Sequence, residues 1–146
     1  MRYAVFLRHD GTAPELRALV EAALSETFDY PARVDVLDDT RLGALLAACP
    51  FPADDLASHT HVTVTSDPAV LDALDEAVSE ADPDAPAVRL GPEATAWTVA
   101  VGGTLGARRS TISSRVRYAP SITDRNLRTM LAVHAALTAM GPDEVG

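Results

Sequence analysis

The spacing of apolar residues along the chain changes repeatedly between two periods, which predicts strands that alternate with helices. A continuous apolar run at 3–7 and alternating apolar and polar residues over 32–37 and 59–65 predict strands. Two more strands are expected at 87–90 and 95–101, on either side of the turn Gly91-Pro92. In the segment 59–65 the alternation separates two valines from a polar strand face. Strands interleaved with helices are typical of a mixed α/β or α+β domain.

Apolar positions three and four residues apart predict four helices. The first starts at Thr12 or Ala13, the second at Asp39 or Thr40 and the third at Asp67-Pro68. The last helix is expected from about residue 123 to residue 140, with Ser121 or Thr123 as its N-cap. Residues 110–118 are ambiguous, and their local alternation favours a strand.

Length and composition limit the possible functions. A chain of 146 residues with 47% hydrophobic residues fits one domain built mostly on Ala, Leu and Val. The chain has no Lys, which excludes Schiff-base and P-loop chemistry and is typical of a GC-rich bacterial genome. A single cysteine, Cys49, excludes an intrachain disulfide and a cysteine-based zinc site. We expect no signal peptide, no membrane span, no cofactor and a cytoplasmic location.

Charge is distributed unevenly along the chain. The formal net charge is −9, but residues 102–135 hold six Arg against one Asp. A basic segment within an acidic protein is a place where an anion can bind. The overall negative charge makes nucleic-acid binding the weakest of the functions considered.

The basic segment supplies the candidate anion site. In the expected last helix, two arginines lie one turn apart near its N-terminus, where free N–H groups attract anions. Two further arginines follow a glycine-rich loop, and in this hypothesis they lie opposite the first two. The candidate anion-binding residues are Arg125, Arg128, Arg109, Arg108, Asn126, Thr129 and Ser110. The alternative is that these arginines pair with the surplus carboxylates of the same chain.

Histidines are the other chemically active candidates. His59 and His61 share one face of an expected strand, and with His9 or Asp10 they are a weak metal hypothesis that lacks an evident third ligand. His134 lies on the apolar stripe of the last helix and is expected to be a hydrogen-bonded core residue. We therefore expect no metal, and His61 and His134 are weak candidates for an acid–base group.

Four segments together resemble one family. They are Met1-Arg2-Tyr3-Ala4-Val5-Phe6-Leu7-Arg8, Leu45-Leu46-Ala47-Ala48-Cys49-Pro50-Phe51, His61-Val62-Thr63-Val64 and Thr123-Asp124-Arg125-Asn126-Leu127-Arg128-Thr129. In this order they are similar to the bacterial domain-of-unknown-function family 1697. The resemblance implies a ferredoxin-like βαββαβ first half, a smaller α/β second half and a short helix within 110–118. The family's second strand–helix unit, with a Ser-Gly-Asn motif, has no counterpart here.

These observations lead to one set of expectations. The chain is expected to be an α+β domain with a shortened ferredoxin-like half at 1–52 and a second α/β half at 59–141. A sheet that lacks one strand–helix unit has an open edge, which predicts a homodimer. The favoured function is a non-catalytic binding or interaction protein that uses its Arg-rich C-terminal face. The alternatives are an enzyme acting on a small anionic substrate, with His61 or His134 as acid–base, and a weak nucleic-acid binder.

Overall fold

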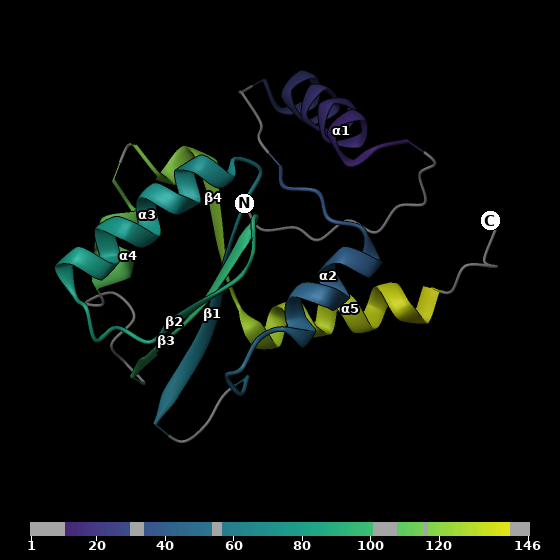
Figure 1. Ribbon diagram of the computed structural model, residues 1–146. Helices are drawn as coiled ribbons and strands as arrows, with labels where there is room; N and C mark the ends of the chain where they lie inside the picture. Colours follow the sequence, from purple (N-terminus) through teal and green to yellow (C-terminus); the bar gives the residue numbers. More distant parts are fainter. Residues whose placement is uncertain (1–10, 30–33, 54–56, 101–107, 116, 141–146) are drawn as a thin grey trace.

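A computed structural model of the chain describes residues 11–29, 34–53, 57–100, 108–115 and 117–140 (Figure 1). Within these residues it holds five α-helices and one four-stranded antiparallel sheet. The elements follow in the order α1 (Ala13–Phe28), α2 (Asp39–Ala47), β1 (Ser58–Thr65), α3 (Pro68–Ala81), β2 (Ala87–Gly91), β3 (Ala94–Ala100), α4 (Arg108–Ser113), β4 (Ile122–Asn126) and α5 (Leu127–Met140).

Strand β1 is the centre of the sheet. The strands lie in the order β2-β3-β1-β4, and every neighbouring pair is antiparallel. His61 of β1 lies opposite Trp97 of β3 on one side and Asn126 of β4 on the other. From Ser58 to Asn126 the elements therefore succeed one another as β-α-β-β-α-β, with each helix connecting two strands that are not neighbours in the sheet.

The two faces of the sheet are covered by different helices and have different chemistry. Helices α2 and α5 pack on the face that carries Val62 and Val64, whereas α3 and α4 cover the opposite face (Figure 1). The first layer is an apolar core that contains Leu42, Leu45, Leu46, Ala94 and Leu127. The second has its own cluster of Leu71, Leu74, Val78, Ile112, Tyr118 and Ile122. The sheet thus buries both faces, including the one that the alternation of 59–65 marks as polar.

Most of the expected elements are present. Thr12 caps α1 in a capping box with Glu15, and Asp38 and Asp67 cap α2 and α3. The strands expected at 59–65, 87–90 and 95–101 are β1, β2 and β3, and α4 decides for helix over strand at 110–113. None of the helices in the described ranges combines the length and apolar content needed to cross a bilayer.

Two expectations about local structure are wrong. Residues 34–37 form no strand; side-chain hydrogen bonds hold them instead, from the Val34 N–H to Glu21 and from the Thr123 hydroxyl to Asp35. The last helix starts at Leu127 and not near Thr123, because residues 122–126 pair with β1 as strand β4. The Asn126 side chain accepts a hydrogen bond from the Arg128 N–H and begins the helix there.

The ferredoxin-like half expected at 1–52 is described only in part. In the described part of 1–52 there are two helices and no strand. The strand expected at 3–7 lies outside the described residues, as does the loop of 102–106. The four strands of the sheet among the described residues come from 58–126.

An ion pair between α2 and the β2–β3 turn fixes the helix on the sheet. Arg41 donates from Nε and Nη2 to the two carboxylate oxygens of Glu93, at 2.8 and 2.5 Å. Gly91 makes the approach possible, since a Cβ there would lie 2.4 Å from Arg41 Nη2 and 2.9 Å from Leu45 Cδ2. The hydrogen bonds from Arg41 lower the pKa of Glu93 below its ordinary value of 4.5, against the opposing effect of burial.

The contact between α2 and α5 depends on a second glycine. A Cβ on Gly43 would lie 2.8 Å from Nε2 of His134, so the imidazole packs directly on the backbone of α2. His134 is half-buried, and its carbonyl accepts a hydrogen bond from the Thr138 hydroxyl. The side chain therefore serves to pack the two helices together.

We expect the Arg41–Glu93 pair to make stability depend on pH. Since the pKa of Glu93 is depressed by folding, its contribution is present above the unfolded pKa and is lost as the pH falls through the folded pKa. Glu93→Gln should lower the urea midpoint at pH 7, and its difference from the parent protein should shrink steadily toward acidic pH. The control, Glu80→Gln on the exposed side of α3, should give no such trend. A difference for Glu93→Gln that does not change with pH would contradict the assignment.

Candidate functional site

Arg109 is the most deeply buried charged side chain in the described part of the chain. It begins in α4 and extends inward to the sheet, where only 4% of its surface is exposed. Its guanidinium carbon lies 5.8 Å from the centre of the Trp97 ring, at the distance of a cation–π contact. A guanidinium withdrawn this far from water needs compensation by charge and hydrogen bonds.

Asp75 of α3 supplies the compensating charge. One of its oxygens, Oδ2, accepts hydrogen bonds from the Thr95 hydroxyl at 2.6 Å and from Arg89 Nη1 at 3.1 Å. The other, Oδ1, lies 2.8 Å from Arg109 Nη2. The two atoms are close enough for an ion pair, but they do not form a hydrogen bond with each other or with any other described group. Asp75 thereby connects β2, β3 and α4 to its own helix.

The Arg109 guanidinium is not saturated by these contacts. Both Nε and Nη2 are buried, and neither donates a hydrogen bond to any described residue. A buried donor without an acceptor costs about 1–3 kcal/mol. Arg109 is therefore a cation with unused hydrogen-bonding capacity inside the protein.

Trp97 is held in a fixed orientation beside Arg109. Its indole Nε1–H donates to the Thr63 hydroxyl at 3.0 Å, and that hydroxyl donates in turn to the Asp124 carboxylate. His61 stacks on the indole with ring centres 4.7 Å apart and an interplanar angle of 23°. The sequence predicts that Trp97 lies in the core, and its burial confirms this. The hydrogen bond to Thr63 also fixes the indole where it lines a pocket.

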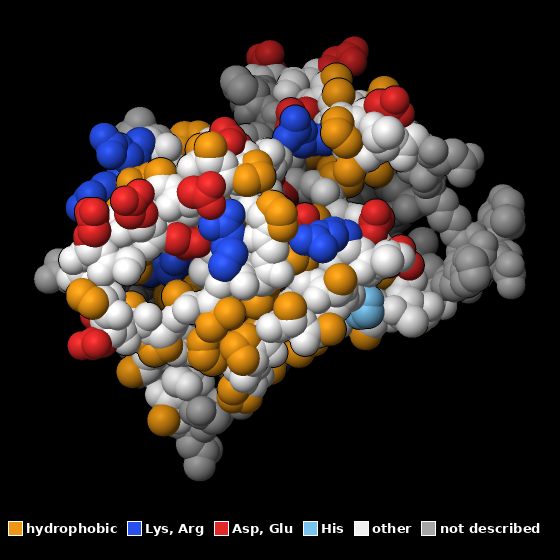
Figure 2. Space-filling model, in the orientation of Figure 1, with side chains coloured by type: hydrophobic (Ala, Val, Ile, Leu, Met, Phe, Trp, Pro, Cys, Tyr) orange, Lys and Arg blue, Asp and Glu red, His pale blue; other side chains and the backbone are white. Residues whose placement is uncertain are grey.

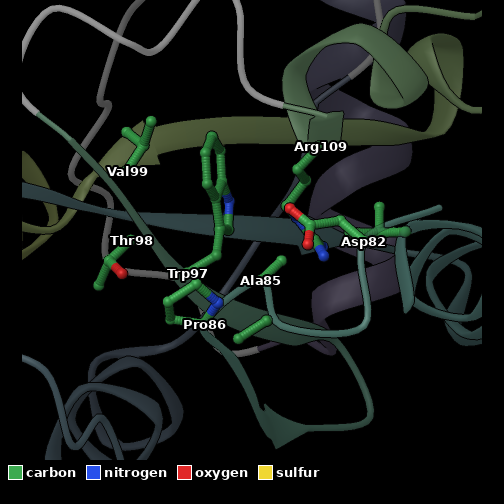
Figure 3. A pocket seen from close by; sticks show the side chains of 9 residues that line it. Asp82, Ala85, Pro86, Trp97, Thr98, Val99 and Arg109 are labelled. Atoms are coloured by element: carbon green, nitrogen blue, oxygen red, sulfur yellow. The ribbon is translucent and has the colours of Figure 1, made fainter. Parts of the chain in front are cut away.

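Arg109 and Trp97 line an open pocket next to α3 (Figure 3). Two overlapping hollows of about 190 and 300 Å³ share part of their walls. The walls of the first are mostly apolar and consist of Val78, Asp82, Ala85, Pro86, Ala87, Trp97, Thr98, Val99 and Arg109. The second adds the polar residues Asp75, Ser79, Arg89 and Thr95. Pockets for drug-sized ligands measure about 300–1,000 Å³, so this one admits only a small molecule.

The structure separates the arginines that the sequence groups together. Arg125 lies in β4 opposite Val62, on the α2 and α5 face, and donates to the Asp124 carbonyl. Arg109 lies on the opposite face, and exposed Arg128 and Thr129 are in the first turn of α5. The expectation that Arg125 and Arg128 sit one turn apart on a helix is therefore wrong. Their role in anion binding stays a prediction, as does that of Arg108 and Ser110, whose side chains lie outside the described structure.

The second arrangement considered, ion pairing within the chain, also has support. Arg109 is in ionic contact with Asp75, and Arg89 lies 2.8 Å from Asp72 in addition to its bond to Asp75. Figure 2 shows acidic and basic side chains lying next to each other over the α3 side of the visible face, where no uninterrupted basic patch appears. Arg109 differs from its neighbours because one charge contact leaves its donors unused.

The histidine candidates lie away from the pocket. His61 contacts Trp97 from the sheet, and His134 packs on Gly43 in the opposite layer. His59 shares the β1 face of His61, while His9 and Asp10 lie outside the described residues. Within the described ranges, no group of three or more His, Cys, Asp or Glu side chains is arranged to hold a metal ion.

Asp75, Asp82 and Arg89 contribute to the pocket and were not singled out from the sequence. Asp75 carries a detectable signal, since it lies four residues after Leu71 and three before Val78 on the buried stripe of α3. A carboxylate on that stripe requires a buried partner. The sequence does not indicate which cation provides it, because Arg89 and Arg109 come from separate elements.

Comparison with known proteins gives one result. A family model described as "Protein of unknown function (DUF1697)" matches residues 4–93. No curated protein and no solved structure matches the chain. The matched residues include α3 and β2 of the pocket, whereas Trp97 and Arg109 lie beyond them.

We expect Arg109→Met to have little effect on stability. The substitution removes an ionic partner of Asp75 but also removes two unsatisfied buried donors, and Asp75 keeps Arg89 and Thr95. The free energy of unfolding should change by less than about 1 kcal/mol, against about 3–5 kcal/mol for breaking a satisfied buried pair. Urea denaturation followed by circular dichroism measures this change.

Arg89→Met is the matched comparison. Arg89 donates to the carbonyls of Gly91 and Pro92 as well as to Asp75, so its hydrogen bonds are satisfied. It should therefore destabilise the protein more than Arg109→Met does. The opposite order would show that Arg109 is an ordinary structural cation.

Proposed function

The chain belongs to the DUF1697 family of proteins of unknown function, and from its own residues we propose that it is a non-catalytic protein that binds a small carboxylate at Arg109. The observation that carries the proposal is a guanidinium 4% exposed that lines a pocket, whose Nε and Nη2 make no hydrogen bond to a described residue, although Nη2 is in ionic contact with Asp75. Natural proteins satisfy nearly all such groups, and an unsatisfied one at a pocket calls for a ligand that supplies the acceptor.

Arg41 supports a carboxylate as that acceptor. It uses Nε and Nη2, the same pair of donors, to bind both oxygens of the Glu93 carboxylate. This side-on fork matches the spacing of carboxylate oxygens. In the proposed complex, the carboxylate of the ligand takes the place at Arg109 that Glu93 has at Arg41.

The charge of the pocket favours a carboxylate over a phosphate. Its walls contain Arg89 and Arg109 together with Asp75 and Asp82, so their formal charges cancel. A phosphate dianion would add a large uncompensated charge beside two carboxylates, which is unfavourable in a partly dry site. The modest volume also disfavours nucleotides and other large cofactors.

A binding role fits the pocket better than catalysis does. The oxygens of Asp75 are already engaged with Thr95, Arg89 and Arg109. The acid–base candidates, His61 and His134, are not among the residues that line either hollow. This supports the non-catalytic alternative that the sequence favours, at a different set of residues.

We also infer that residues 58–126 form a ferredoxin-like core, at a different place in the chain from the first half for which the family resemblance implies one. The support is the β-α-β-β-α-β succession combined with the strand order β2-β3-β1-β4, in which each helix connects strands separated by a third. In this assignment, Arg109 comes from the second helix of the core and Asp75 from the first. The pocket lies between them on the helical face.

The carboxylate site is tested by titration with 4-methylpentanoate. Trp97 is the single tryptophan of the chain, so its fluorescence reports directly on the pocket. We expect the carboxylate to change the emission and the neutral 4-methylpentanamide to leave it unchanged. Arg109→Met should weaken binding about ten- to a hundredfold, the effect of losing one charge-assisted hydrogen-bond pair.

Arg117→Met is the control for this titration. Arg117 is exposed and contacts the Tyr118 ring rather than the pocket. Its loss should leave the affinity for 4-methylpentanoate unchanged. Equal affinity for acid and amide, or equal loss in both variants, would refute the carboxylate site.

A homodimer is the second proposal, supported by an open sheet edge. Strand β2 is one of the two outer strands, no described segment pairs with its free edge, and Val88 on it is 38% exposed. Exposed strand edges of this kind pair readily with another copy. Light scattering at tens of micromolar should give a dimer that Val88→Lys converts to a monomer. A monomeric parent protein would contradict the proposal.

A further inference from the structure

Asp82 introduces a second unsatisfied charge into the pocket. It lines both hollows and is half-buried, and its carboxylate has no hydrogen bond or ion pair with any described residue. Only its backbone is engaged, through the N–H to Val78 and the carbonyl to Ala85. Asp82, Arg109, Trp97 and Pro86 are labelled among the side chains that line the pocket in Figure 3.

The position of Asp82 at the end of α3 makes its negative charge costly. It is the C-cap of a helix of 14 residues, where the helix dipole is negative and cations are favoured. A Lys or Arg in the last turn would interact favourably with the dipole, but α3 has no basic residue there. A positive group bound at Asp82 would therefore be stabilised by both the carboxylate and the helix.

The pocket thus offers a cation with free donors and an anion without a partner, next to an apolar wall. The wall consists of Val78, Ala85, Pro86, Ala87 and Val99 together with the ring of Trp97. We propose that the ligand is a zwitterion, an α-amino acid with a small apolar side chain. Its carboxylate binds Arg109, its ammonium group binds Asp82, and its side chain contacts the apolar wall.

This inference rests on the proposed function, since it requires the carboxylate site at Arg109. It adds the ammonium group and explains how a neutral pocket accepts a charged ligand. A simple carboxylate would place one uncompensated negative charge near Asp82. A zwitterion leaves the sum of charges in the pocket at zero and forms an ion pair at each end.

Three matched ligands test the proposal on the parent protein. L-leucine carries both charges, 4-methylpentanoate lacks the ammonium group and 3-methylbutan-1-amine lacks the carboxylate. With Trp97 fluorescence and calorimetry as readouts, we expect leucine to bind at least about tenfold tighter than either analogue, the gain from one additional charge-assisted contact. If 4-methylpentanoate binds as tightly as leucine, the zwitterion is refuted while the carboxylate site stands. If no ligand binds, both proposals fail.

Asp82→Asn locates the ammonium contact. The side chain has no partner in the described structure, so the variant should fold normally. It should reduce the affinity for leucine to the level of 4-methylpentanoate and leave 4-methylpentanoate binding unchanged or slightly tighter. Glu80→Gln, two residues earlier on the exposed side of α3, is the control and should change neither affinity. Equal loss of both ligands on Asp82→Asn would overturn the assignment of the ammonium group.

Discussion

The arrangement of the layer between the sheet and α3–α4 depends on the carboxylate of Asp75. It accepts from Thr95 on β3 and from Arg89 on β2, and it is the ionic partner of Arg109 on α4. A carboxylate in this position is stable only when cations and donors surround it, because removal from water costs several kcal/mol. Four elements that are separate in the sequence must therefore converge on one side chain, and this convergence brings Arg109 to the sheet.

The same layer shows why Arg109 is exceptional. The sheet presents a row of buried threonines to α3 and α4, and each has a partner: Thr63 bonds Trp97 and Asp124, Thr65 bonds Ser121, and Thr95 bonds Asp75. Buried polar groups in folded proteins are generally satisfied in this way. Arg109 departs from the rule at a point where the surface is hollow. The proposed ligand would supply the acceptor that Arg109 lacks at this point.

Local signals were sufficient for most elements, and their failures have a common cause. The spacing of apolar residues and the helix-capping residues located helices α1, α2 and α3 and strands β1, β2 and β3. They failed at residues 122–126, because that segment is a strand only through its pairing with β1 and carries just one fully buried residue, Ile122. They failed at 34–37 for the opposite reason: the alternation is present, but side-chain bonds to Glu21 and Thr123 replace a neighbouring strand. Pairing between distant segments decides such cases.

The candidate site was predictable only in part, because counting charges along the sequence does not show which side chains lie on the same face of the folded sheet. The sequence identified the basic segment, and Arg109 was among its candidate residues. It grouped Arg109 with Arg125, but Arg125 pairs with Val62 and therefore lies on the other face of the sheet. What distinguishes Arg109 is its surroundings, and Arg41 makes the comparison within the same molecule. At the surface, Arg41 has both oxygens of Glu93 on its Nε and Nη2. Arg109 has the same donors buried beside a pocket without a hydrogen bond to any described residue, and Nη2 has an ionic contact with Asp75. In the proposed complex, the carboxylate of the ligand gives Arg109 the coordination that Glu93 gives Arg41, at the pocket that Arg109 lines.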